Sequence, residues 1–429
     1  MIASLNSYNR LWACLRPLMP LYLRWRGLRG KEDNNRRGER LAKSWQHHRP
    51  EGVLIWLHAV SVGETVAAVS LAQACLEAHP SSHILITTNT KTALNRLEQI
   101  RPDRCLACYQ PLDEAICVRR FLAYWRPNGA VFLESDFWPN LVIQTAQQDI
   151  PVTFASSQLS DKAFANWQKR PALAKQLFGA ARLICAVDDA QASKFERLCQ
   201  TKDGTKPLIK TLGSLKLSPA SLSVDPSFSG AVKAAAAGRP VVLAASTHEP
   251  EEQLILAASD ELAAAGHQHL LIIAPRHSER GDEIARLMAG TKRRSKAELP
   301  QTQDRVFLAD SFGELGSLIS AADIVILGGS FADKGGHNPL EIAALGRPVI
   351  TGPSQFKNQA EFDTLHRIGQ TVTAADKNGL CTQLSQWLDK LDKDKQVLDQ
   401  TILGQARAYV TRACERPAKT AQLVIDALR

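Results

Sequence analysis

Residues 323–341 read DIVILGGSFADKGGHNPLE, and this stretch decides the fold. The apolar run Asp323–Leu327 predicts a buried strand, and Pro339 is typical of the first turn of a helix. Four glycines lie between the two. Glycine lets backbone amides approach an anion, and a helix N-terminus favours negative charge. The stretch therefore predicts a strand–turn–helix unit of the Rossmann type, with Glu341 placed to hold ribose hydroxyls.

The same alternation of short apolar runs and amphipathic stretches extends in both directions. In the second half, strands are predicted at Pro240–Ala245, Leu270–Ala274, Arg305–Leu308, Asp323–Leu327, Pro348–Thr351 and Gln370–Val372. In the first half, they are predicted at Val53–Leu57, His83–Thr87, Ala130–Leu133, Val152–Ala155 and Leu183–Ala186. Helices are expected near Thr65–Ala78, Thr92–Ile100, Asp113–Trp125, Lys162–Phe178 and Ala190–Cys199. This order indicates parallel sheets with helices on both faces.

The alternation breaks once, at residues 213–239, where Ser, Pro and Ala dominate. We therefore predict an α/β protein with two Rossmann-like, doubly wound domains that face a central cleft. The predicted parts are a basic and apolar membrane-associating segment (1–50), a first domain (51–212), a linker (213–239), a second domain (240–394) and a C-terminal helix (395–429). Ligands of such sheets bind at the carboxyl ends of the strands, where the strand order reverses.

The net charge of the 429-residue chain, +9, is concentrated at one end. Residues 1–50 hold 11 Lys and Arg against 3 acids, a net charge of +8, so the remaining 379 residues carry +1. A basic chain often binds nucleic acid. Because the body here is nearly neutral, we expect no nucleic-acid partner.

The N-terminal segment contains the apolar run Leu11–Leu23, LWACLRPLMPLYL. A bilayer span needs about 20 apolar residues, and this run is shorter and is broken by Arg16, Pro17 and Pro20. No small-residue cleavage site follows it, as a secretory signal would require. Apolar and aromatic residues flanked by arginines are typical of an interfacial anchor. The alternative is a solvated basic extension whose Leu and Trp side chains pack on the protein.

Nine cysteines, an odd and scattered set, argue against a disulfide framework. The close pair Cys105 and Cys108 has no second pair at zinc spacing, so two semi-buried thiols are expected. Glu134 and Asp136 resemble a metal-binding pair, but no other acidic cluster accompanies them. We therefore expect no metal and no other cofactor.

Two strand ends in the first half carry candidate site residues. His58–Glu64, HAVSVGE, leads from a strand into a helix, which places Ser61, Gly63 and Glu64 at the turn. Glu64 is a candidate catalytic base, or simply a helix-terminal carboxylate that the macrodipole stabilises. After another strand, Glu134 and Trp138 lie in the run Glu134–Asn140. No dinucleotide fingerprint, G-x-G-x-x-G, is present.

In the second half, Ser246 and Thr247 follow a strand and precede a helix rich in Glu. Hydroxyls and free amides at such a turn suit phosphate, although they also make an ordinary helix cap. Arg276 follows the next strand and can pair with phosphate or carboxylate. Together with the Gly-rich turn and Glu341, these residues favour a nucleotide-sugar site.

These motifs, taken in order over nearly the whole chain, resemble the 3-deoxy-D-manno-octulosonate (Kdo) transferases, lipid A glycosyltransferases of the GT-B fold. The matching residues are Gly30-Lys31-Glu32, His58–Glu64, Glu134 with Trp138-Pro139-Asn140, Leu159-Ser160, Gly213 with Leu215-Lys216, Ser246–Glu252, Pro275-Arg276-His277, Asp310 with Gly313-Glu314-Leu315, and Gly328–Glu341.

The resemblance implies an inverting transfer of Kdo from CMP-Kdo to a lipid A precursor, lipid IVA, in lipopolysaccharide core synthesis. It assigns the base to Glu64 on the first, acceptor domain. It assigns the donor, on the second domain, to Ser246, Thr247, Arg276, Gly336, His337, Asn338, Glu341 and Lys216. Ser61, Gly63, Glu134 and Trp138 would line the acceptor side. The N-terminal segment would lie on the cytoplasmic face of the inner membrane.

The chain departs from the family pattern at a few positions. Asp136 and Phe137 stand where Glu and Leu are usual, Ser156-Ser157-Gln158 replaces Asn-Ala-Arg, and Ser214 replaces Asn. These positions cluster on the acceptor side and the linker, so the acceptor and the number of Kdo residues added stay open. The alternatives are another GT-B enzyme, such as a UDP-sugar transferase or epimerase, and an inactive sugar-binding paralogue.

Overall fold

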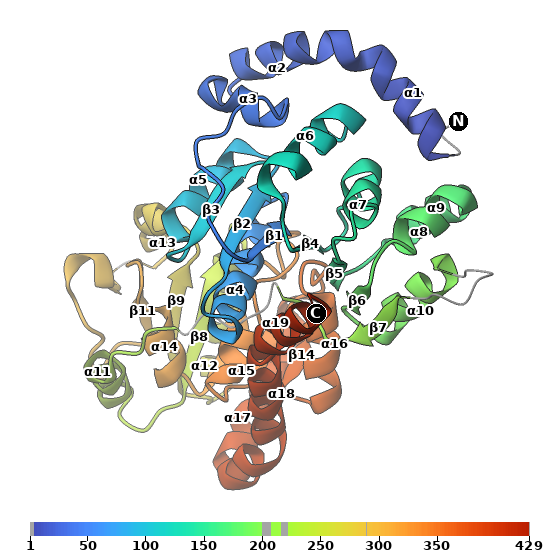
Figure 1. The fold of residues 1–429 in the computed structure, drawn as a ribbon. Helices are drawn as coiled ribbons and strands as arrows, with labels where there is room; N and C mark the ends of the chain where they lie inside the picture. Colours follow the sequence, from blue (N-terminus) through green and yellow to red (C-terminus); the bar gives the residue numbers. More distant parts are fainter. Residues whose placement is uncertain (1–3, 200–206, 216–221, 289, 429) are drawn as a thin grey trace. The chain divides into compact units, whose positions relative to one another are not determined.

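The computed structural model describes residues 4–199, 207–215, 222–288 and 290–428, and the chain divides into two compact units. The first unit comprises residues 1–218 and 415–429, and the second comprises residues 219–414 (Figure 1). Each unit is built around one seven-stranded parallel sheet. The predicted α/β class is therefore confirmed for both halves, whereas the central cleft between them stays a prediction.

The first sheet has the strand order β3-β2-β1-β4-β5-β6-β7. Its strands are β1 (Leu54–His58), β2 (His83–Thr88), β3 (Cys105–Tyr109), β4 (Gly129–Leu133), β5 (Val152–Ser157), β6 (Leu183–Ala186) and β7 (Leu208–Thr211). The helices around it are α4 (Val62–Ala78), α5 (Lys91–Ile100), α6 (Ala115–Trp125), α7 (Pro139–Ala146), α8 (Asp161–Gln168), α9 (Pro171–Phe178), α10 (Asp189–Leu198) and α19 (Arg416–Ala427). The strand order reverses between β1 and β4.

The second sheet has the order β10-β11-β9-β8-β12-β13-β14. Its strands are β8 (Val241–Thr247), β9 (Leu270–Pro275), β10 (Lys292–Arg293), β11 (Val306–Leu308), β12 (Ile324–Leu327), β13 (Val349–Thr351) and β14 (Thr371–Thr373). Its helices are α11 (Pro226–Ala236), α12 (Glu251–Ala264), η3 (Ser278–Arg280), α13 (Gly281–Arg286), η4 (Arg294–Lys296), α14 (Leu315–Ala321), α15 (Leu340–Ala344), α16 (Gln359–Ile368), α17 (Lys377–Leu398), η5 (Asp399–Leu403) and α18 (Gly404–Cys414). Here the order reverses between β8 and β12.

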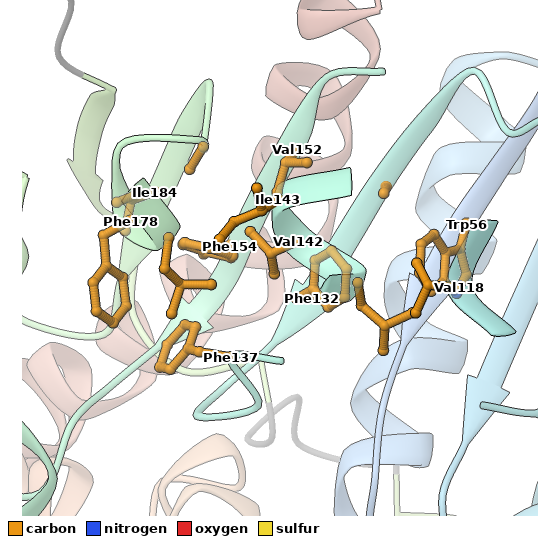
Figure 2. Packing of buried hydrophobic residues seen from close by; sticks show 14 of the residues in the cluster. Trp56, Val118, Phe132, Phe137, Val142, Ile143, Val152, Phe154, Phe178 and Ile184 are labelled. Atoms are coloured by element: carbon orange, nitrogen blue, oxygen red, sulfur yellow. The ribbon is translucent and has the colours of Figure 1, made fainter. Parts of the chain in front are cut away.

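The core of the first unit lies on both faces of its sheet because alternate side chains of each strand point to opposite faces. In β1, Leu54 and Trp56 belong to one apolar cluster and Ile55 and Leu57 to the other. Figure 2 shows the first cluster, in which the rings of Phe132 and Phe154 meet aliphatic side chains of α7 and neighbouring strands. Both faces of the sheet are thus buried, as parallel sheets require.

Phe137, one of the departures from the family pattern, is part of this core. Its ring lies 5.0 Å from the rings of Phe154 and Phe178, edge to face, and it is 8% exposed (Figure 2). The change from Leu therefore adds aromatic packing inside the first unit.

The boundaries differ from the predicted ones in two places. The predicted linker 213–239 contains α11, whose Phe228 and Val232 are buried in the core of the second unit. The predicted C-terminal helix is divided: α18 belongs to the second unit, whereas α19 belongs to the first. Val424 and Ile425 of α19 share an apolar cluster with α4, and this burial explains why the chain returns.

The N-terminal segment of the first unit is helical, with α1 (Leu5–Leu15), η1 (Arg16–Leu18), α2 (Met19–Leu28), η2 (Asn34–Arg36) and α3 (Arg37–Arg40). Figure 1 shows α1 and α2 as a curved pair at the outside of this unit. Within the described chain, no helix has the length and apolar character needed to cross a bilayer. Met19 and Leu23 are the buried residues of α2.

Candidate functional site

In the first unit, the loop after β1 fixes the carboxylate of Glu64 at the start of α4. The Ser61 hydroxyl donates to Glu64 Oε1 at 2.9 Å, and the Val60 amide donates to Oε2 at 2.7 Å. The Glu64 amide in turn donates to Ser61 Oγ, which completes a capping box. Gly63 is exposed in the first turn. This geometry is compatible with both interpretations of Glu64, a catalytic base or a helix-terminal carboxylate. A carboxylate has more lone pairs than these hydrogen bonds use, so it can still accept a proton.

The loop after β4, the neighbouring strand, carries Glu134 and Trp138. Glu134 is buried and adopts a left-handed backbone conformation, φ 60°, which is uncommon for a residue other than glycine. Trp138 precedes α7 and packs partly buried against the core. Glu64 and Glu134 thus follow adjacent strands at the point where the strand order reverses, as a doubly wound sheet predicts for ligand-binding groups.

His58, at the end of β1, is a buried core histidine. Its Nδ1 lies 2.8 Å from Thr87 Oγ1, and the same hydroxyl oxygen accepts from Trp56 Nε1 at 2.8 Å. Burial lowers the pKa of His58 to about 3. The imidazole is therefore neutral at pH 7 and connects β1 to β2.

In the second unit, the end of β8 holds Ser246 and Thr247 differently from what the sequence predicts. The Thr247 hydroxyl is buried and donates to Glu252 Oε1 at 2.8 Å, and Glu252 also pairs with Arg280. Ser246 is half-buried with a left-handed backbone, φ 55°. Of the two hydroxyls predicted to bind phosphate, that of Thr247 therefore already donates its proton to a side chain of the protein.

The Gly-rich turn after β12 also corrects an expectation. The sequence suggests that its amides approach a bound anion, but the amides of residues 329–332 donate to the carboxylate of Glu251. Further along, the amides of Gly336 and His337 donate to carbonyls of the turn itself. The anion that these amides bind is the protein's own.

Beside this turn, the rings of His248 and His337 lie edge to edge in nearly one plane, with their centroids 5.2 Å apart and their planes within 4°. The two Nε2 atoms are 2.9 Å apart, so one ring donates a hydrogen bond to the other. Burial, together with the nearby His248 and Arg276, lowers the pKa of His337 to about 4. Both imidazoles are therefore neutral at pH 7. The Nε2 of one ring carries a proton and donates it in the hydrogen bond, and the Nε2 of the other ring accepts it.

Arg276 and Glu341 complete the predicted donor residues. Arg276 is exposed, and its backbone amide donates to Thr247 O at 3.0 Å. Among the described residues, none forms a salt bridge or hydrogen bond with its guanidinium. Burial raises the pKa of Glu341, while the Asn338 amide group, 3.5 Å from Glu341 Oε1, and the Arg276 charge oppose that rise.

The structure thus brings Ser246, Arg276, Gly336, His337, Asn338 and Glu341 to the carboxyl ends of β8, β9 and β12. Lys216 lies outside the described residues. Two further cations, Lys334 and Lys357, contribute positive charge at the histidine pair. Lys334 lies inside the Gly-rich stretch, so its position in the sequence could have identified it as a site residue. Lys357 lies outside every motif, and no sequence signal identifies it. Within the described ranges, no three His, Cys, Asp or Glu side chains are grouped to hold a metal.

Comparisons with known proteins agree on one family. Residues 35–218 match the family model described as 3-deoxy-D-manno-octulosonic-acid transferase (kdotransferase). The 3-deoxy-D-manno-octulosonic acid transferase of Bordetella pertussis is 35% identical over 72% of this chain and 73% of its own length. That of Haemophilus influenzae is 30% identical over 86% of this chain and 88% of its own length.

Among solved structures, a glycosyltransferase from Rickettsia africae is similar, with a TM-score of 0.56 and 13% identity over 89% of this chain and all of that one. The UDP-GlcNAc 2-epimerase of Neisseria meningitidis has a TM-score of 0.53 and 12% identity over 88% of this chain and 99% of its own. At such low identity these two likenesses concern the fold alone.

Proposed function

Because the chain belongs to the 3-deoxy-D-manno-octulosonic acid (Kdo) transferase family, a family of glycosyltransferases, we propose that it moves Kdo from CMP-Kdo to a lipid A precursor, lipid IVA, with inversion at the anomeric carbon. The observation that carries the donor assignment is the group of Arg276, His337 and Glu341 at neighbouring strand ends of the second unit. The two α/β units have the GT-B architecture.

The chemistry of the donor fits this group. CMP-Kdo carries two anionic groups, the phosphate and the sugar carboxylate, and Arg276 is an exposed guanidinium with no partner among the described side chains. Guanidinium pairs with both kinds of anion in a bidentate manner. Glu341 and Asn338 supply acceptors and donors for ribose hydroxyls. As the transfer proceeds, negative charge accumulates on the leaving phosphate, and a cation placed there stabilises the transition state.

Glu64 is the proposed general base. The hydroxyl oxygen of the acceptor forms a bond to the anomeric carbon, while the bond from that carbon to the phosphate breaks and its electron pair leaves with CMP. The hydroxyl proton passes to the Glu64 carboxylate, which Ser61 and Val60 hold in place. A positioned base of this kind is worth roughly 10²–10⁴ in rate.

We also propose that the N-terminal helices attach the protein to the cytoplasmic face of the inner membrane. Large apolar side chains are exposed along this segment, namely Leu11, Leu15, Leu18, Leu21, Tyr22, Trp25 and Leu28. Arginines flank them, and the Arg29 guanidinium lies 4.2 Å from the Trp25 ring centroid. An exposed apolar surface with basic neighbours is typical of interfacial attachment to an anionic bilayer.

The direct test incubates the purified protein with CMP-Kdo and lipid IVA and follows the products by mass spectrometry. We expect one or more Kdo units on the lipid and release of CMP. A lipid that gains no Kdo in the presence of intact donor would contradict the proposal. The same spectrum counts the Kdo units added.

A further inference from the structure

The buried carboxylate of Glu251, the first residue of α12, accepts hydrogen bonds from five backbone amides. Oε1 accepts from Ser330 at 3.0 Å, from Phe331 at 2.8 Å and from Ala332 at 3.0 Å. Oε2 accepts from Gly329 at 2.8 Å and from His248 at 2.9 Å. Glu251 is 1% exposed. Successive amides that converge on one point form an anion-binding concavity, and here the occupant is a side chain of the same unit.

The five amides come from two different loops. Four belong to the turn after β12, and the fifth, from His248, belongs to the loop after β8. These strands are the neighbours between which the strand order reverses. Oε2 therefore bridges the loop of His248 to the loop of His337, and Oε1 serves the second of these loops alone.

The histidine pair lies directly beside this bridge. His248 comes from the first loop and His337 from the end of the second, and their Nε2 atoms are 2.9 Å apart. Gly329, whose amide binds Oε2, has φ 69°, and a Cβ built there would lie 3.0 Å from His337 Cδ2. The Asn358 side-chain amide holds the backbone of His337 by donating a hydrogen bond to the His337 carbonyl oxygen at 3.1 Å. Small shifts between the loops would separate the two rings.

We propose that Glu251 is a positioning residue of the donor site: its carboxylate fixes the His248 loop against the His337 loop, and by filling the turn's amides it leaves the donor's anions to side chains such as Arg276. This inference rests on the proposed function, because that function makes these loops the donor site. Glu251 itself touches no substrate.

The informative substitution is Glu251→Gln. One side-chain oxygen becomes an amide group, which faces amide donors and cannot accept from them. In the more favourable orientation, the glutamine oxygen keeps the three hydrogen bonds that Oε1 accepts, and its amide group replaces Oε2. The two hydrogen bonds at Oε2, which bridge the loops, are then lost. Glu261→Gln, on the same helix, is the matched control, since Glu261 forms an exposed pair with Lys377.

The experiment measures CMP and UMP affinity by calorimetry, and the KM for CMP-Kdo separately from kcat. For Glu251→Gln we expect CMP affinity to fall and the donor KM to rise by about tenfold or more, while kcat at saturating donor changes less. Hydrogen exchange should become faster at the amides of residues 329–332. Glu261→Gln should match the wild type.

A role limited to global stability would lower the amount of folded enzyme and thus kcat, but would leave KM and the affinity per folded molecule unchanged. That pattern, or donor constants within about twofold of wild type, would overturn the proposal. If Glu251→Gln does not fold, Glu251→Asp serves instead: it keeps the charge but retracts the carboxylate by one methylene, and the same rise in donor KM is expected.

The two proposals fail in different ways. A wild type that binds UMP in preference to CMP contradicts the proposed donor, yet a loss of UMP affinity in Glu251→Gln still supports the positioning role. A wild type that binds CMP, with Glu251→Gln binding it equally well, contradicts the positioning role alone. A wild type that binds neither nucleotide contradicts both.

Discussion

The phenol of Tyr8 donates a hydrogen bond to Asp113 Oδ2 at 2.8 Å, and this contact joins the N-terminal helix to the body of the first unit. The same carboxylate accepts the backbone amides of Asn140 and Leu141, at 3.1 and 2.8 Å, and so caps α7. Next to it, Glu114 caps α6 and pairs with Arg16. Two adjacent carboxylates thus tie the N-terminal helices to the body of the unit: Asp113 to α7, which begins at the Trp138-Pro139-Asn140 motif, and Glu114 to α6.

Tyr8→Phe should loosen this attachment. The substitution removes the donor and leaves a buried carboxylate with one hydrogen bond fewer, which costs about 1–3 kcal/mol. We expect a lower melting temperature in calorimetry and faster proteolysis of residues near the N-terminus. Tyr22→Phe is the control, because Tyr22 is exposed and its hydroxyl accepts a long hydrogen bond from Arg26 at 3.5 Å. Equal stabilities for the two variants would show that the Tyr8 contact contributes nothing.

Glu64→Gln should keep the fold and CMP binding but lose most of the transfer. Glutamine preserves the shape of the capping box but cannot accept the acceptor's proton, so kcat should fall by roughly 10²–10⁴. Stopped assays with CMP-Kdo and lipid IVA, read by mass spectrometry, measure this. Glu77→Gln, an exposed position at the other end of α4, should retain wild-type turnover. Near-normal turnover in Glu64→Gln would remove the base assignment.

Arg276→Ala should raise the KM for CMP-Kdo and lower kcat together, because the same cation meets the donor in the ground state and the leaving phosphate in the transition state. The expected loss in kcat/KM is about 10²-fold or more. Arg276→Lys should recover only part of it, since lysine cannot form the bidentate pair. Arg286→Ala, an exposed arginine of α13, is the control. A donor KM unchanged in Arg276→Ala would place the donor's anions elsewhere.

Stability should fall as the solution becomes acidic, and His58 should account for part of the loss. Burial lowers its pKa from 6.5 to about 3, so between these values the unfolded chain binds a proton that the folded chain does not. The stabilisation is complete above about pH 6.5 and is lost as pH falls toward 3, by at most ~1.4 kcal/mol per pH unit.

Denaturant unfolding of His58→Asn at several pH values measures this contribution. We expect a flatter dependence on pH than in the wild type, with lower stability at pH 7 from the altered packing. His48→Asn, at an exposed position, should keep the wild-type slope. An unchanged slope in His58→Asn would mean that other groups carry the acid sensitivity.

The exposed apolar side chains of α2 should be needed for membrane binding. Co-sedimentation with vesicles of phosphatidylethanolamine and phosphatidylglycerol should show binding that weakens as salt rises. The triple change of Leu21, Trp25 and Leu28 to Ser should lower binding by about tenfold or more, since each apolar side chain contributes to burial in the interface. Leu287→Ser, an exposed leucine of the second unit, should bind as the wild type does. Equal binding by the triple variant would point to another surface.

The sequence identified the strands that are rich in Val, Ile and Leu within one or two residues, because buried parallel strands are continuous apolar runs. It missed β3, Cys105–Tyr109, β7, Leu208–Thr211, and β10, Lys292–Arg293, which are edge strands of mixed composition. It joined α8 and α9 into one helix, although Pro171 begins a new one. The missed strands are defined by pairing at a sheet edge, which local pattern does not show, whereas the break at Pro171 was a local signal that the prediction passed over.

The candidate site shows the same limit. The motifs placed Glu64, Arg276 and His337 at strand ends, where the structure has them. They could not reveal that the Thr247 hydroxyl turns inward to Glu252, or that Glu251 fills the amides of the glycine turn. A carboxylate and an amide 78 positions apart meet only after the sheet has formed, so no spacing in the sequence announces the contact. Lys357 was not predicted as a site residue for the same reason, because only the folded structure brings it near His337.

The packing of α19 on α4 has a consequence for how the protein is made. The first unit is discontinuous: the second unit is inserted between its body and its final helix, and the chain crosses between them twice. During synthesis, the part of α4 that packs on α19 stays uncovered until residues 416–427 leave the ribosome, long after the rest of the unit has emerged. The helix that presents Glu64 is therefore the last part of the first unit to be completed, and cutting the chain at the linker alone cannot yield that unit whole.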